Sequence, residues 1–281
     1  MYLFLLTLLT ILAFQFIQFL YVLSQSVTGR LAGTAIITNS IGMGPTLFQI
    51  YLNGTEWRVG LLPLGGSTKF VNEESLLENS FFLTEEDPIQ PLYSLPVFSR
   101  ALILLVGPCS NIVLGLILLW SATFFNGSKV VVAPDAGTLI SPSAVPELAW
   151  KNEKANWDSQ NTLIKKSFLT YWYRFFTFQS LTGWGGIMGC MVTCAAALSQ
   201  SPPAWLTCFG IICLGTGCLN LLPIPILNGG YFVFLLMEAV AGKKEMIRLI
   251  TKCNYAGIVI VLFVMLRLLY CDITWCYSQF F

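Results

Sequence analysis

The sequence contains no histidine and few charged residues. Charged side chains make up 10% of its 281 residues, against about a quarter in soluble domains. The net charge is only +1, which leaves no electrostatic basis for binding nucleic acid. The lack of histidine removes the side chain that most often serves as general acid or base and as metal ligand.

Long apolar runs take the place of charge. Hydrophobic residues make up 56% of the chain, and the mean hydropathy is +0.72. Residues 1–24, 101–125, 203–224 and 255–271 each approach or exceed the roughly 20 residues that a membrane-spanning helix needs. We therefore predict an α-helical integral membrane protein with four spanning helices. Residues 183–199, rich in small side chains, are either a fifth span or a close-packed re-entrant segment.

Nine cysteines are scattered mostly through these apolar runs. We interpret them as buried free thiols that pack as small hydrophobic side chains. Their spacing is not typical of a zinc ribbon or a redox pair.

Residues 42–70 contain two strand-like runs, FQIYL and EWRVGLL, on either side of Asn53-Gly54. This dipeptide favours the type I′ turn of a β-hairpin. The hairpin is either a plain connection between helices or a sheet edge on which an extended substrate or partner segment could pair.

Two polar regions divide the chain. Residues 71–99 carry an acidic, proline-containing loop, and residues 126–175 form a small insert of mixed charge. We predict residues 1–125 as the first half of a membrane core and residues 176–281 as the second half.

The stretch NLLPIPILNGG, residues 220–230, ends an apolar run in an unusual way. Pro223 and Pro225 lack the amide hydrogens that continue a helix, and Gly229 and Gly230 allow backbone angles that other residues avoid. A break at membrane depth frees backbone polar groups, which is tolerated only where protein or a wet cavity satisfies them. We expect the break to form the floor of a buried polar site.

The residues after the break are predicted to form a half-buried helix over 231–241. Glu238 is interpreted as an interfacial residue rather than an acid of the site. The basic cluster that follows could contact anionic lipid, or it is an ordinary solvated helix end. Its members are Lys243, Lys244, Arg248 and Lys252.

Several of these stretches together resemble the site-2 protease family of intramembrane zinc metalloproteases. The family's late break has the form NxxPxPxLDGG, the LLPLGG end of the hairpin resembles its membrane-associated β-loop, and RALILLVGPCSN resembles the start of its second core helix. The resemblance implies the site-2 protease membrane core. It also suggests a groove for a substrate or partner, with the candidates Pro63, Leu64, Gly65, Gly66, Asn220, Pro223, Pro225, Gly229 and Gly230.

In that family, two histidines of an HExxH motif and the aspartate of LDG hold the zinc ion, and the glutamate is the general base. By resemblance, SQSVTGRLA falls at the HExxH position. Ser24 and Thr28 then replace the histidines, Gln25 replaces the glutamate, and Asn228 replaces the aspartate. These neutral side chains can hydrogen-bond, so we expect them to form a polar cluster.

From these replacements the sequence predicts a chain that is not an enzyme, with no catalytic residue, metal or cofactor of its own. It would be a pseudoprotease that binds other integral membrane proteins, transmembrane segments and lipid, in the inner membrane if the source is bacterial. The alternative is a membrane metalloendopeptidase whose metal ligands are altered or supplied by a partner chain.

Overall fold

The computed structural model describes residues 2–72, 90–126 and 187–280. The predicted insert at 126–175 and most of the acidic loop lie outside these ranges, apart from the insert's first residue. The chain divides into two compact units, which are treated separately below. Unit 1 comprises Met1–Thr10, Leu114–Gly215 and Val259–Phe281, and unit 2 comprises Ile11–Val113 and Thr216–Ile258.

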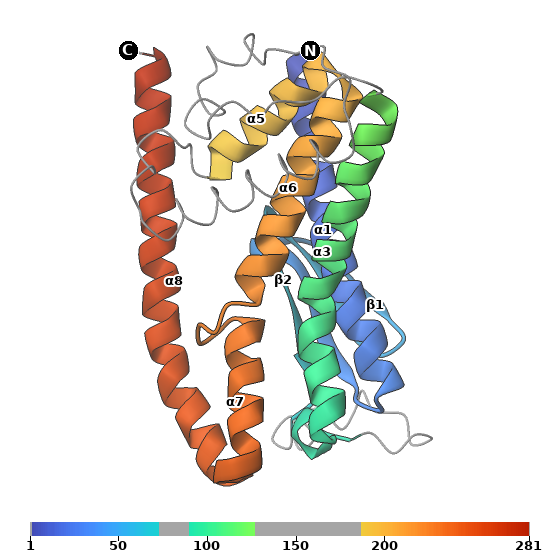
Figure 1. Cartoon of the computed structure of the whole chain (residues 1–281), viewed down its shortest axis with the longest axis vertical. Helices are drawn as coiled ribbons and strands as arrows, with labels where there is room; N and C mark the ends of the chain where they lie inside the picture. Colours follow the sequence, from blue (N-terminus) through green and yellow to red (C-terminus); the bar gives the residue numbers. More distant parts are fainter. Residues whose placement is uncertain (1, 73–89, 127–186, 281) are drawn as a thin grey trace. The chain divides into compact units, whose positions relative to one another are not determined.

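The described helices are α1 (Tyr2–Leu31), a short 3-10 helix (Leu92–Ser94), α3 (Val97–Asn126), α5 (Ile187–Gln200), α6 (Pro202–Asn220), α7 (Asn228–Ala241) and α8 (Lys243–Phe280) (Figure 1). Among the described residues, four helical segments are long and apolar enough to cross a membrane. They are Leu8–Leu31, Val97–Phe125, Pro202–Asn220 and Lys252–Tyr270. The predicted multi-pass helical membrane protein is thus confirmed. With 14 residues, α5 is shorter than the roughly 20 that a span requires.

In unit 2, the predicted hairpin is confirmed as an antiparallel sheet of β1 (Ile36–Leu52) and β2 (Thr55–Phe70). Its turn residues Asn53 and Gly54 have φ of 49° and 73°, as a type I′ turn requires. Ile41 pairs with both Gly66 and Val59. Because a residue has one partner on each side, the first half of β1 lies between the two halves of β2.

Polar contacts join α1 to this sheet in unit 2. The buried Ser26 hydroxyl donates to Asn39 Oδ1 at 2.8 Å. The Arg30 guanidinium donates to Thr55 Oγ1 at 2.9 Å, and that hydroxyl donates to the Ile36 carbonyl at 3.0 Å. These bonds fix the C-terminal half of α1 against the sheet.

The break between α6 and α7, also in unit 2, is a tight loop. Helix α6 ends at Asn220, before the first proline, as the missing amide hydrogens dictate. Ile226 has φ of 79°, a left-handed conformation that is strained for a β-branched residue. A Cβ at Gly229 would collide with the Leu221 carbonyl oxygen, and one at Gly230 with that of Ile224. Only glycine therefore allows the loop to wrap this closely around the start of α7.

The same loop is supported by α8. Gly257 of α8 lies against the Pro225 carbonyl so closely that a Cβ would clash with it. Tyr231 of α7 accepts a hydrogen bond from Asn254 Nδ2 of α8 at 2.9 Å. The start of α8 therefore folds back beside α7 as a helical hairpin, whose turn is drawn in Figure 1.

In unit 1, helices pack through small residues. A Cβ on Gly210 of α6 would lie 2.7 Å from Leu119 Cγ of α3, so the missing side chain permits this contact. Cys194 of α5 and Cys208 of α6 hydrogen-bond each other. The two cysteines lie on different helices, each seven residues from Ser201, where the helices meet. Their spacing along the sequence therefore does not predict the contact.

Candidate functional site

One face of α1 in unit 2 carries Tyr21, Ser24, Gln25 and Thr28. Their spacing of three, four and seven residues places them on the same side of a helix. The Ser24 hydroxyl donates to the Tyr21 carbonyl at 2.7 Å, and the Thr28 hydroxyl donates to the Ser24 carbonyl at 2.9 Å. Ser24 Oγ also lies 3.4 Å from Ser110 Oγ of α3. This face of α1 therefore carries a row of polar side chains.

Asn228, the first residue of α7, joins this face to α3. Its side-chain Nδ2 donates to the Tyr21 hydroxyl at 2.8 Å and to the Leu104 carbonyl at 2.7 Å. The Gln25 side chain also hydrogen-bonds the Tyr21 hydroxyl. The Tyr21 ring lies flat against Gly107, where a Cβ would be 2.7 Å from Cε2. Three helices thus meet at a buried phenol.

The bond from Asn228 to Leu104 has a cause in the sequence of α3. The Leu104 carbonyl would normally accept from the amide of residue 108, but that residue is proline and has no N–H. A carbonyl left unsatisfied in an apolar environment is costly. The Asn228 amide supplies the missing donor, which a carboxylate in its place could not do.

The predicted polar cluster is thus organised by a residue that the sequence analysis missed. Gln25 and Asn228 hydrogen-bond the Tyr21 hydroxyl, whereas the hydroxyls of Ser24 and Thr28 donate to backbone carbonyls of α1. Tyr21 lies one turn before Gln25, and this spacing is the only sequence signal for its role. In an apolar run, a tyrosine is more simply read as a core side chain.

The proposed groove residues lie on two different elements. Gly65 (φ of 66°) and Gly66 are in β2, and a Cβ on Gly66 would lie 2.7 Å from Val22 of α1. The side chains of Pro63 and Leu64 lie outside the described ones. Asn220 is the last residue of α6, where its Nδ2 donates to the Thr216 carbonyl at 3.0 Å. The remaining candidates belong to the loop before α7 or to its first turn. A groove shared by both sets stays a prediction.

Glu238 has a charged partner, while its expected place at the membrane interface stays a prediction. Its carboxylate forms an ion pair with Arg100 near the start of α3, with side-chain exposures of 12% and 8%. No sequence pattern pairs these two residues, which are 138 positions apart.

These side chains do not fit a zinc ion. Zinc in proteins takes imidazole, thiolate or carboxylate donors, whereas the site offers hydroxyls and amides, and the Asn228 amide is turned toward a carbonyl. Within the described ranges, no group of three or more Cys, Asp or Glu residues lies close enough to hold a metal.

Comparison with known proteins decides the family. The profile of peptidase family M50 matches residues 11–264. The chain belongs to this family, the site-2 proteases. The match includes α1 from residue 11, the β-sheet, α3, α6, α7 and α8 as far as residue 264, and hence every residue of the polar site.

Several bacterial proteins resemble the chain, and each carries the name "Putative zinc metalloprotease". A Campylobacter jejuni protein is 24% identical in an alignment that covers 94% of this chain and 92% of that protein. A Chlamydia pneumoniae protein is 30% identical over 125 residues, and a Brucella suis protein is 33% identical over 115. Those two matches span only 19% and 30% of the respective relatives.

These findings correct the prediction that the chain is not an enzyme. The family and all of these relatives are named as metalloproteases, which points to protease activity. The prediction rested on the replacement of the HExxH residues by Ser24, Gln25 and Thr28 and of the LDG aspartate by Asn228. The absence of histidine excludes the HExxH ligand set from this chain, but it does not exclude carboxylates, thiols or the ligands of another chain.

Proposed function

We propose that this chain acts in a membrane metalloendopeptidase whose metal ligands are altered or are supplied by a partner chain. Membership of peptidase family M50 carries this proposal, since the family profile matches residues 11–264. The names of the relatives support the same class of reaction. The substrate would be a transmembrane or membrane-adjacent polypeptide segment, because the polar site lies among apolar helices of spanning length.

The chain's own contribution would be to hold that segment. Residues 46–52 of β1 pair on one side only, with the start of β2, and many of their apolar side chains are exposed. An extended segment could add to such an edge through main-chain hydrogen bonds. The groove candidates in β2 and in the loop before α7 would then contact its side chains.

The test compares the chain alone with its complex from native membranes, isolated by cross-linking through an affinity tag. Metal content and cleavage of transmembrane peptides in proteoliposomes would be measured for both samples, with and without a chelator. If only the complex contains metal and shows chelator-sensitive cleavage, a partner chain supplies the ligands. If both samples do, the ligands are altered residues of this chain. Neither metal nor cleavage in either sample would overturn the proposal.

A further inference from the structure

Helix α7 is attached to α3 at two polar points in unit 2. At its first residue, Asn228 donates to the Leu104 carbonyl. Ten residues further on, which is about 15 Å along a helix, Glu238 meets Arg100. Both bonds reach the first turns of α3. Contacts with α3 therefore fix α7 at its first residue and again near its C-terminal end.

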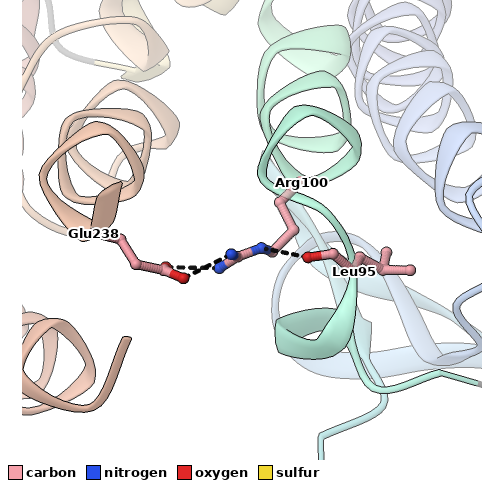
Figure 2. A network of polar contacts seen from close by, with 3 residues as sticks. All are labelled: Leu95, Arg100 and Glu238. Carbon is pink, nitrogen blue, oxygen red and sulfur yellow. Dashed lines mark hydrogen bonds and ion pairs between the residues drawn. The ribbon is translucent and has the colours of Figure 1, made fainter. Parts of the chain in front are cut away.

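The second attachment is a complete ion pair (Figure 2). Arg100 Nη1 and Nη2 donate to the two Glu238 carboxylate oxygens at 2.8 and 2.7 Å, and Nε donates to the Leu95 carbonyl at 3.1 Å. Two parallel charged hydrogen bonds fix orientation as well as distance. Because both side chains are nearly buried, loss of either partner would leave the other charge without compensation.

The two ends of α7 are held differently. At its start, the loop before α7 wraps around Gly229 and Gly230, and the strained Ile226 lies directly before it. At its far end, Gly242 (φ of 84°) joins α7 to α8, and a Cβ there would meet nothing within 4 Å. The start is therefore a fixed pivot and the turn at Gly242 is open, which suits a hinged arm.

We propose that the hairpin of α7 and the start of α8, residues 228–257, is such an arm, and that the Arg100–Glu238 pair is the latch that holds it closed. Arg100 and Glu238 are then positioning residues. Opening must break the Arg100–Glu238 pair and must also expose the apolar side chains of Phe234 and Leu235, which are buried. Release moves the far end of α7 away from α3 and opens the contact between these helices from that end toward Asn228, which borders the polar site at Tyr21.

The access role rests on the proposed function, whereas the latch itself does not. The test is hydrogen–deuterium exchange of the full chain in nanodiscs, comparing peptides from 231–241 with peptides from 101–113 of α3. Glu238→Gln should speed exchange in α7 by about tenfold or more with α3 unchanged, because it leaves the Arg100 charge buried and unpaired. Exchanging the charges with Arg100→Glu and Glu238→Arg should restore slow exchange.

The apolar double variant Arg100→Met, Glu238→Leu tests whether the faster exchange of Glu238→Gln comes from an unpaired buried charge. It has no charge that must be solvated, so α7 should exchange no faster than in the parent. Equal acceleration in α3 and α7 of Glu238→Gln would show general destabilisation and overturn the latch, as would no change in α7. If these exchange results hold but no cleavage is found in any sample, the latch stands and the proposed function fails.

Discussion

Asn228 and Pro108 should be energetically coupled, because one residue supplies the hydrogen bond that the other removes. In the parent protein, Asn228→Ala deletes the donor to the Leu104 carbonyl and the donor to the Tyr21 hydroxyl. A buried acceptor left unpaired costs about 1–3 kcal/mol, and an ordinary hydrogen bond contributes roughly 1 kcal/mol net. We therefore expect Asn228→Ala to lower the free energy of unfolding by about 2–4 kcal/mol.

The same substitution should cost less in a Pro108→Ala background. Alanine at 108 restores an amide hydrogen for the Leu104 carbonyl, so only the Tyr21 bond is then lost with Asn228. The double-mutant cycle should show a coupling energy of about 1–3 kcal/mol. Any cavity created by Pro108→Ala is present both with and without Asn228→Ala, so its cost cancels in the coupling energy. Asn228→Asp, measured at a pH high enough to ionise it, is the matched variant, since the carboxylate keeps the size of the side chain but cannot donate to the carbonyl.

The assay is equilibrium unfolding in mixed micelles, followed by tryptophan fluorescence for the four proteins of the cycle and for Asn228→Asp. Additive effects, within about 0.5 kcal/mol, would refute the assignment of Asn228 as the donor that compensates for Pro108. A similar conclusion would follow if Asn228→Asp were as stable as the parent, because a carboxylate facing a carbonyl should be repelled.

Other predictions concern packing. Gly257→Ala should lower the free energy of unfolding and disturb the loop before α7, because its Cβ would enter that loop. Limited digestion with proteinase K, which does not require Lys or Arg, would report faster cleavage near residues 220–230. Ile226→Gly should be less destabilising than Ile224→Gly by about 1 kcal/mol, because of the two residues only Ile226 has a left-handed φ, and glycine relieves the cost of that conformation. Thermal unfolding of the two variants would measure the difference. Mild oxidation should join Cys194 and Cys208 in a disulfide detectable by mass spectrometry, and its absence would contradict the contact between α5 and α6.

Local patterns were sufficient for much of the fold. The apolar runs predicted the four spans because a membrane-spanning helix must be long and uncharged whatever its neighbours are. Asn53-Gly54 predicted the hairpin turn because its backbone angles depend on those two residues alone. The prolines after Asn220 predicted the end of α6, since a missing amide hydrogen is a local property.

Contacts between distant residues were decided only by the tertiary structure. Tyr21 becomes the centre of the site because α3 and α7 approach it, and Glu238 is buried because Arg100 lies opposite. Whether the amide at Asn228 compensates for Pro108 depends on how α7 lies against α3, which neither segment encodes by itself. The sequence by itself determined the family, the membrane core and the lack of histidine ligands. The tertiary structure decided which polar side chains meet, because hydrogen bonds and ion pairs require positions in space that no spacing along the chain defines.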